Sequence, residues 1–381
     1  MANVLTDLAA DIYKAADVVG RELVGFIPAS TINANGSERV AKGDVVRASF
    51  TRAAAAVDVS ESMTIPEGTD QTVDNKTLTI SKSRAVQIPY TGENVLHLNN
   101  GIGFETVYGD QVVQAMRTLV NEIESDMATE AYQNSSRAFG TAGTTPFGSN
   151  FSEVAEIRQI LVDNGMPQND GQVSLVLNTL AGTNLRQLAQ LQKANEAGGS
   201  DLLRQGILLD LQGLGIRESA AVKAHTKGTG ASYLVNDASS AIGDTTIAAD
   251  GGSGTILAGD VITINGDTNK YVVNTALAGG SLVIGGTGLR AAAADNAAIT
   301  VGNSYTANVA FHRRALELAM RAPAVPQGGD SADDAMLIQD PHSGLVFEIR
   351  VYKGYRKTMI EVAAAWGVKA WKSDFIATLL G

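Results

Sequence analysis

The sequence has no cysteine, few aromatic residues and few charged residues. The absence of cysteine excludes a disulfide-stabilised scaffold and cysteine-ligated zinc, and it is typical of a protein assembled in a reducing cytoplasm. Aromatic residues make up 5% and charged residues 18% of the 381 residues, whereas the 40 glycines exceed the usual share of about 7%. No apolar run approaches the roughly 18 residues that a membrane span requires.

Basic residues are fewer than acidic residues, and the formal net charge is -11. This charge argues against an extended nucleic-acid-binding surface, because phosphate binding requires clustered lysine and arginine. The N-terminus lacks the basic and then apolar layout of a signal peptide, since Asp7 and Asp11 precede the first lysine, Lys14. We therefore expect a protein that is neither exported through a signal peptide nor membrane-bound.

The first third of the chain predicts a helix followed by an extended segment. Residues 3–26 carry one apolar stripe at helical spacing, formed by Leu5, Leu8, Ile12, Val19, Leu23 and Phe26. Pro28 and a predicted turn from Asn33 to Gly36 end this helix. Strand-like patterns then run from Gly43 to Leu98, at Val45–Phe50, Lys76–Ser81 and Arg84–Tyr90. This segment has too few large apolar residues for a core of its own, so we expect a long β-arm.

The middle of the chain predicts a long helix and then an α/β region. Apolar residues hold helical spacing from about Gln111 to Ala131, which corresponds to roughly 30 Å of helix. The α/β region is predicted to contain a helix at Ser152–Asp163, a strand at Val173–Leu177, a helix at Thr179–Ala194 and a short apolar run at Ile207–Leu211.

Residues 226–305 differ from their surroundings. They hold 14 of the 40 glycines and neither tryptophan nor phenylalanine. Short strands are predicted at Thr255–Leu257, Val261–Ile264, Lys270–Val273 and Leu282–Ile284, with a hairpin turn at Asn265–Asp267. Short strands at near-regular spacing predict a small β-barrel or sandwich, inserted between two halves of one domain.

The C-terminal quarter is the most distinctive part. A helix is predicted from Ala310 to Arg321, because Phe311, Ala315, Leu318 and Ala319 recur every three or four residues. Leu345–Val351 alternates as a half-buried strand, Lys353-Gly354 predicts a tight turn, and Arg356–Ala364 a return strand. Gly367-Val368-Lys369 and a last apolar strand, Phe375–Leu380, follow.

This ending resembles the closing strands of major capsid proteins of tailed double-stranded DNA bacteriophages. The order of the parts resembles the Hong Kong 97-type capsid fold, and more specifically the coat proteins of short-tailed phages related to phage P-twenty-two, which carry an inserted domain. The most specific local matches are Leu203-RQGILLDLQGLGIRES and Asn308-VAFHRRALELAM, on either side of the predicted insertion.

The resemblance implies an α+β, Hong Kong 97-like fold with an inserted small all-β domain. Its implied parts are an N-terminal arm (1–32), an extended β-arm or E-loop with peripheral strands (33–98), a spine helix and peripheral domain (99–150), the first part of an axial domain (151–225), the inserted domain (226–305), and the second part of the axial domain with the closing strands (306–381).

The implied function is self-assembly, as pentamers and hexamers, into an icosahedral shell that encloses DNA without sequence-specific binding. The negative charge agrees with such a container, because a shell wall that does not bind phosphates allows DNA to move into the shell. The resemblance also implies a scaffolding protein and a portal protein as partners, no cofactor, assembly in the host cytoplasm and a final location in the virion.

Candidate contact residues follow from charge and position. Asp7, Asp11 and Asp17 lie off the apolar stripe of the first helix and are typical of a solvated face; the resemblance implies that they also contact a basic scaffolding protein, and both can hold. Candidates for contacts between subunits are Lys76, Lys82, Asp244 and Asp250. A lysine–asparagine crosslink at Lys76 or Lys82, used by some capsids of this fold, is not expected.

Two other classes of function are alternative hypotheses. Gly286-x-Gly288-x-x-Ala291 after a strand mimics a dinucleotide-binding turn, and a nucleotide-dependent enzyme is the alternative hypothesis; a secreted β-rich adhesin is a more distant one. The true fingerprint requires a crossover helix and an acidic residue about 20 positions on, whereas Asp295 comes too early. The four histidines, His97, His225, His312 and His342, have no paired metal-ligand spacing. We therefore expect no enzyme activity.

Overall fold

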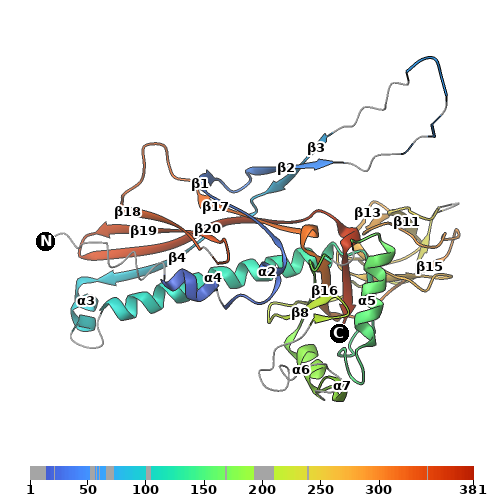
Figure 1. Ribbon diagram of the computed structural model, residues 1–381, viewed down its shortest axis with the longest axis horizontal. Coiled ribbons are helices and arrows are strands. Elements are labelled where there is room, and N and C mark those ends of the chain that lie inside the picture. The colour runs from blue at the N-terminus through green and yellow to red at the C-terminus, as the bar shows by residue number, and fades with distance from the viewer. Residues whose placement is uncertain are drawn as a thin grey trace.

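The computed structural model describes residues 14–20, 22–51, 56, 58–59, 61–65, 73–99, 104–167, 170–192, 210–237, 240–340 and 342–381. The molecule is elongated, and strands β2 and β3 project from its body (Figure 1). A long helix runs along the body, with one sheet on it and a second, larger sheet at the end that carries the C-terminus.

Helix α4, Phe104–Gln133, is the predicted long helix, and it begins earlier than the sequence pattern indicated. Its 30 residues span about 45 Å at 1.5 Å per residue. Met116, Val120, Ile123 and Met127 are all buried, as the helical spacing predicts. The short helix α3, Gly92–Asn99, precedes it.

The sheet on α4, here called the peripheral sheet, is centred on the long strand β20, Lys357–Ala370. One edge of β20 pairs with β4, Lys82–Thr91. The other edge pairs first with β19, Val346–Gly354, and then with β17, Leu316–Pro323, so these two strands lie end to end. The outer strands are β18, Ala332–Gln339, beside β19, and β1, Thr31–Val40, parallel to β17.

The β-arm predicted from the sequence is a hairpin-like pair, β2 (Val45–Thr51) with β3 (Val73–Thr79). Its base packs on the peripheral sheet through Leu78 and Ile80. The arm crosses the sheet at Gly367, where an added Cβ would lie 2.2 Å from the carbonyl oxygen of Thr79. A side chain at position 367 would therefore push the arm away, which gives the Gly-Val-Lys step a physical reason.

The larger sheet forms the axial region. Its central strand is β16, Tyr305–His312, which pairs with β21, Ile376–Leu380, and with β6, Val173–Leu177. The sheet also contains β5 (Arg137–Phe139), β7 (Asp210–Leu211), β8 (Leu214–Glu218) and β9 (Ala224–His225). The helices of this region are α5 (Ser152–Asp163), α6 (Thr179–Gln187) and α7 (Ala189–Gln192).

The glycine-rich segment forms a β-barrel. In the described chain, six antiparallel strands pair in a closed ring, in the order β12-β15-β10-β11-β14-β13 and back to β12. They are β10 (Tyr233–Val235), β11 (Thr246–Asp250), β12 (Val261–Ile264), β13 (Lys270–Ala278), β14 (Ser281–Ile284) and β15 (Ala298–Val301). They enclose a hydrophobic core of their own, in which Tyr271 is the largest fully buried side chain. That the barrel is a separable inserted domain stays a prediction.

The helix predicted from Ala310 to Arg321 is wrong. This segment forms the end of β16, the 3-10 turn Arg313–Ala315 and most of β17. Phe311 lies in one hydrophobic cluster and Ala310 in another, so β16 is buried on both faces. A strand with two apolar faces has no alternation of apolar and polar residues. The periodicity of the sequence alone therefore cannot distinguish such a strand from a buried helix.

Smaller predictions also require correction. Asn33 to Gly36 lies within strand β1 and is not a turn. The helix predicted at Thr179–Ala194 is interrupted at Leu188, which has an extended backbone. Thr255–Leu257 is not a strand; the Leu257 amide donates to Asp260 Oδ2 at 2.7 Å. The sequence patterns were right about α5, β6, β12 and the hairpin turn that joins β12 to β13.

The predicted N-terminal helix is confirmed only in part. Residues 14–20 are helical, but the chain at residues 23–25 is not, and a separate short helix, α2 (Phe26–Ala29), follows. Ala15, Ala16 and Val19 are buried. Asp7 and Asp11 lie outside the described residues.

Candidate assembly surfaces

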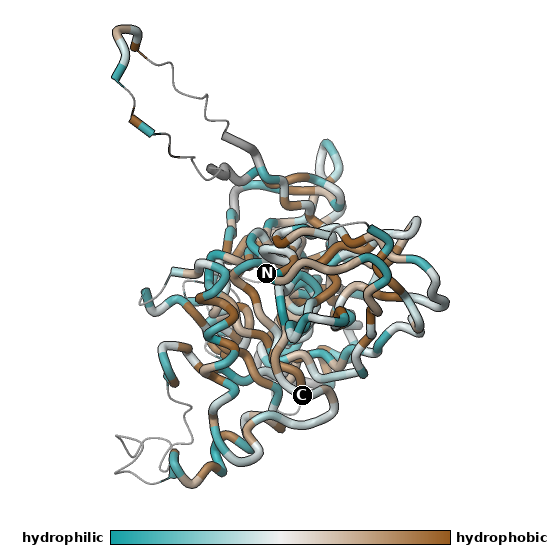
Figure 2. Tube along the Cα trace, turned by 90° about the vertical axis from the view of Figure 1, so that its right-hand side faces the viewer, coloured by the Kyte–Doolittle hydropathy of each residue, from teal (hydrophilic) through white to brown (hydrophobic). Residues whose placement is uncertain are grey.

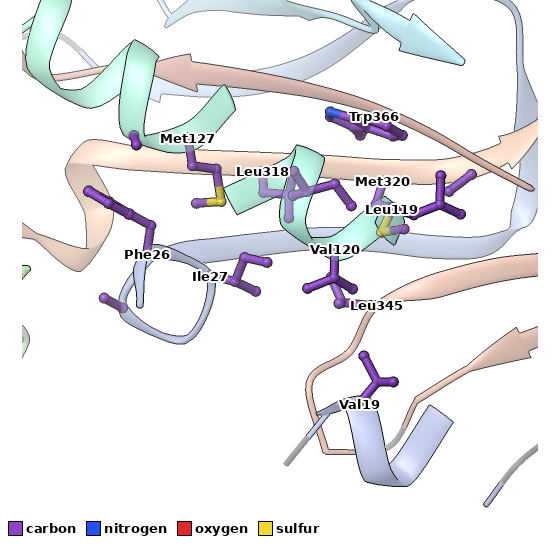
Figure 3. Close-up of a cluster of buried hydrophobic side chains, with 14 of the residues drawn as sticks. Val19, Phe26, Ile27, Leu119, Val120, Met127, Leu318, Met320, Leu345 and Trp366 are labelled. Carbon is purple, nitrogen blue, oxygen red and sulfur yellow. The ribbon is translucent and has the colours of Figure 1, made fainter. Parts of the chain in front are cut away.

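The N-terminal segment is attached to the long helix by a buried carboxylate. Glu124 of α4 accepts hydrogen bonds from the backbone amides of Phe26 and Ile27, and from the Ser219 hydroxyl at 3.0 Å. Figure 3 shows Phe26 and Ile27 facing the side of α4 that carries Val120 and Met127. An added Cβ at Gly25 would lie 1.8 Å from a Glu124 oxygen, so the chain must be glycine there. Glu124 could not be singled out from the sequence, because other carboxylates, such as Glu122 and Asp126, lie on the same helix.

Glu124 should make stability depend on pH. Burial, the largest influence, raises the pKa of its carboxyl, although the hydrogen bonds from Phe26 and Ile27 oppose that rise. A carboxyl whose pKa is raised by folding binds its proton more tightly in the folded state. The free energy of unfolding should therefore fall as pH rises from the ordinary pKa of a glutamate through the raised one. Thermal unfolding across this range, compared with Glu124→Gln, checks this: the difference between the two proteins should change with pH, and a constant difference contradicts it.

A row of carboxylates four residues apart holds the other side of α4 to the peripheral sheet. Glu122 makes a two-point ion pair with Arg84, and Asp126 pairs with Lys82 at 2.7 Å and accepts from the Trp366 indole at 2.9 Å. One turn further on, Glu130 accepts from the backbone amide of Ala370 at 3.0 Å. Lys82, a candidate for contacts between subunits, is thus engaged within its own chain.

Lys76, the second lysine candidate, lies on β3 of the arm. Its Nζ donates to the carbonyl of Trp371 at 3.3 Å and lies 5.8 Å from the centre of that indole ring. Beyond the strands, the arm exposes Val59, Met63 and Ile65, each with at least 89% of its surface accessible. Lys76 therefore fixes the base of the arm to its own subunit, and Val59, Met63 and Ile65 are exposed apolar side chains of the described part of the arm.

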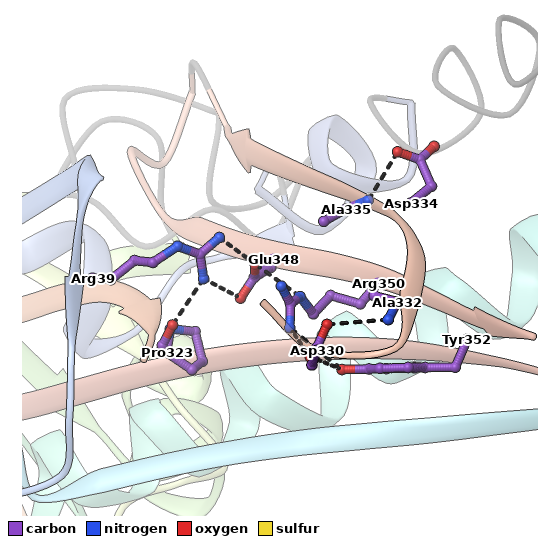
Figure 4. A network of polar contacts seen from close by, with 9 residues as sticks. All are labelled: Arg39, Pro323, Asp330, Ala332, Asp334, Ala335, Glu348, Arg350 and Tyr352. Carbon is purple, nitrogen blue, oxygen red and sulfur yellow. Dashed lines mark hydrogen bonds and ion pairs between the residues drawn. The ribbon is translucent and has the colours of Figure 1, made fainter. Parts of the chain in front are cut away.

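A buried ion network fills the seam where β17 ends and β19 begins. Glu348, whose side chain is 2% exposed, pairs with Arg39 of β1 at 2.6 Å and with Arg350 at 3.2 Å (Figure 4). Arg39 also donates to the Pro323 carbonyl at 2.9 Å, and Arg350 pairs with Asp330. The sequence alternation assigned Glu348 and Arg350 to a solvated face of the strand. Glu348 and Arg350 are buried because strand β1 lies over that seam. The alternation of residues within one strand does not show that a distant strand packs on it.

The barrel is joined to the rest of the molecule by a buried polar cluster. His225 Nε2 lies 2.8 Å from Asp260, and its Nδ1 lies 3.4 Å from the Tyr132 hydroxyl at the end of α4. Tyr305 donates to the Gly259 carbonyl at 2.6 Å, and burial raises the pKa of both tyrosines. The cluster links the long helix, both chain connections to the barrel and the start of β12, so it fixes where the barrel sits.

The remaining candidate residues lie apart from one another. Asp244 accepts from the Ala241 amide at 2.6 Å in a turn of the barrel, and Asp250 is exposed at the end of β11. Asp17 is half-buried and has a partner of its own. Contacts of Asp17, Asp244 and Asp250 with other subunits or proteins stay predictions.

The glycine loop that mimics a nucleotide site does not have the required structure. After β14 the chain makes turns, and no helix follows it before β15. An added Cβ at Gly286 would lie 2.4 Å from the Ser136 Cβ, and one at Gly288 would lie 2.4 Å from the Gly243 carbonyl oxygen. The amide of Gly286 already donates to Ser373. The glycines thus allow close packing of the protein on itself, and the loop lacks the helix N-terminus that binds a pyrophosphate.

Within the described ranges, no group of three or more histidine, aspartate or glutamate side chains is placed to hold a metal ion. His312 pairs with Asp170 at 2.7 Å and accepts from the Arg314 amide at 3.1 Å, a role in folding. No described helix is long and apolar enough to cross a membrane.

The fold is similar to that of a solved phage capsid. The capsid protein of cyanophage P-SCSP1u superposes with a TM-score of 0.51 and 12% identity, over 94% of this chain and 88% of that one. The chain has a Hong Kong 97-like capsid fold. Lower TM-scores are found for two further structures. A structure from Mycobacterium phage Che8 has a TM-score of 0.49 and 14% identity, over 94% of this chain and 91% of that one. The capsid of Ralstonia phage GP4 has a TM-score of 0.47 and 9% identity, over 93% of this chain and 90% of that one.

At such low identity the likeness defines the fold alone. No protein-family model matches the chain, and no curated protein matches it. In the terms of this capsid fold, α4 is the spine helix, the sheet on it belongs to the peripheral domain, and β2 with β3 forms the E-loop.

Proposed function

We propose that this chain is a major capsid protein, which assembles as pentamers and hexamers into an icosahedral shell enclosing phage DNA. The observation that carries the proposal is the capsid fold together with an arm that cannot bury its own apolar residues. Val59, Met63 and Ile65 are exposed in the chain between β2 and β3, and an isolated pair of strands is marginally stable in water. Contact with another subunit would remove these side chains from water.

The net charge of -11 supports a shell whose wall does not bind DNA phosphates tightly. A scaffolding protein and a portal protein are the proposed partners, and assembly would take place in the host cytoplasm. The protein would catalyse no reaction.

Electron microscopy and sedimentation of the purified chain, with and without a co-expressed scaffolding protein, test the proposal. We expect closed shells or tubes of regular subunits. A compact monomer under every condition, with the scaffolding protein present, would rule the proposal out.

The acidic N-terminal residues are the proposed scaffold contact. Asp7→Lys, Asp11→Lys and Asp17→Lys, combined, should slow scaffold-assisted assembly while leaving folding largely intact, because a basic partner would meet repulsion. Light scattering measures the rate, and added salt should slow wild-type assembly as exposed charges are screened. Unchanged rates in the triple variant, or salt-independent wild-type rates, would place the scaffold contact elsewhere.

A further inference from the structure

The turn that joins β12 to β13 of the barrel carries an asparagine–glycine pair. Asn265 and Gly266 are both exposed, and an added Cβ at Gly266 would meet no atom within 4 Å. The amide of Asp267 closes the turn by donating to the Ile264 carbonyl at 3.0 Å. Gly266 has a φ of +93°, a conformation that favours glycine after Asn265. In Figure 2 the end of the molecule that carries the barrel faces the viewer, and hydrophobic stretches of its chain are joined by hydrophilic ones.

The side chain of Asn265 and the backbone nitrogen that follows it are both available for reaction. Among the described residues, neither the side-chain amide of Asn265 nor the backbone amide of Gly266 has a hydrogen-bond partner. Glycine has no side chain to shield its nitrogen, so the nitrogen of Gly266 can approach the side-chain carbon Cγ of Asn265. Attack at this carbon closes a five-membered ring within the chain. An asparagine followed by glycine is therefore the pair in which this attack is least hindered.

A second asparagine–glycine pair of the chain is protected from the same reaction. Asn164, at the end of α5, is 8% exposed, and its side-chain nitrogen donates to the Ser136 hydroxyl at 3.0 Å and to the Asp374 carbonyl at 2.8 Å. The amide of Gly165 donates to the Val162 carbonyl at 2.9 Å. Of the other two pairs in the sequence, 35–36 lies within strand β1 and 100–101 lies outside the described residues. One molecule thus holds the same two residues in an open and in a closed setting.

We propose that Asn265 is a site of spontaneous deamidation, at which the protein modifies its own chain without an enzyme. The Gly266 nitrogen loses its proton to solvent and forms a bond to Cγ of Asn265, while the bond from Cγ to Nδ2 breaks and that nitrogen leaves as ammonia. The resulting succinimide ring takes up one water molecule and opens at either of its two carbonyl carbons. The products at position 265 are aspartate and isoaspartate, so one amide and one water become one carboxylate and one ammonium ion.

The modification changes a turn on which the core of the barrel depends. It adds a negative charge two residues before Asp267, and isoaspartate also adds one methylene to the backbone. The Asp267 carboxylate accepts from the Asn269 amide at 2.9 Å and from the Tyr271 hydroxyl. Tyr271 is the largest fully buried side chain of the barrel core, and Asn269 accepts from Arg137 of β5 at 2.9 Å. Deamidation at the turn therefore acts both on the barrel core and on its attachment to β5.

Peptide mapping by mass spectrometry of the full-length, folded chain tests the proposal. During incubation at mildly alkaline pH, which favours loss of the amide proton, the peptide containing Asn265 should gain one mass unit and separate into two products of equal mass. Its rate should exceed that of the peptide containing Asn164 by about tenfold or more, because Asn164 reacts only in the fraction of molecules whose local hydrogen bonds are open.

Two controls show whether the structure sets the rate. In urea-unfolded protein, Asn164 and Asn265 should react at similar rates, because no fold protects either pair. Asn265→Gln should remove the modification of this turn, since the longer side chain closes the corresponding larger ring far more slowly.

The outcomes decide the proposal independently of the proposed capsid function. If Asn265 stays intact in the folded protein while it reacts in urea, the turn holds the pair closed and the proposal is overturned. Equal rates for Asn164 and Asn265 in the folded protein would also overturn it, because burial and hydrogen bonding would then not select the site. Shell formation is measured separately by electron microscopy, and its failure would leave this result unchanged.

Discussion

Replacing Glu348 with alanine should lower the free energy of unfolding by about 1.5–3 kcal/mol, because Arg39 and Arg350 both lose the buried carboxylate that they share, while Arg350 keeps its pair with Asp330. Arg350 is 9% exposed, and Glu348 lies between it and Arg39. Asp330, the other acidic partner of Arg350, lies in a loop at the end of the network and cannot replace Glu348 at Arg39. Urea denaturation monitored by circular dichroism measures the loss.

The exposed ion pair of the neighbouring strands provides the control. Asp333→Ala breaks the Asp333–Lys353 pair, in which both side chains are about half exposed or more, and should cost about 1 kcal/mol or less. Equal losses for Glu348→Ala and Asp333→Ala would mean that the seam between β17 and β19 is open to water.

Replacing Trp366 with alanine should cost about 3–5 kcal/mol, the range for removing a large aromatic side chain from a core. Trp366 is the largest fully buried side chain, and it lies at the centre of β20, between β4 and β17. Figure 3 places it beside Leu318 and Met320 of β17. Its indole also donates to Asp126, so the substitution removes one attachment of the spine helix.

The second tryptophan of the chain is a matched control. Trp371→Ala should cost clearly less, because Trp371 is only half-buried at the end of the same strand. Thermal unfolding of the two variants, each followed by the fluorescence of the remaining tryptophan, gives the comparison. Similar melting temperatures for both variants would contradict the central place of Trp366 in the core.

How far the sequence could predict the fold depended on how each segment is buried. Helix α4 was predictable because it buries one face, with Met116, Val120, Ile123 and Met127 at helical spacing. Strand β16 was mistaken for a helix because Ala310 and Phe311 enter different hydrophobic clusters. The order of the strands in the sheets depends on contacts between residues far apart in sequence, such as those of β1 with β17, which no local pattern contains.

The candidate site was predicted less well than the fold. Low apolar content predicted a β-arm without a core of its own, but the charge of a residue alone does not show where its partner lies. Lys76 and Lys82 were candidates for contacts between subunits, yet both have partners in their own chain. Only the assembled tertiary structure supplies that information.

The connections to the barrel have a consequence for engineering. Ala224 pairs with Thr306 and His225 with Tyr305, so the chain leaves the axial sheet and returns to it on adjacent antiparallel strands. Strand ends in this arrangement lie about 5 Å apart and can be joined by a two-residue turn. The position between them therefore suits a foreign module whose own termini lie close together, and replacing the barrel with such a module would also remove the pairing of β13 with β5.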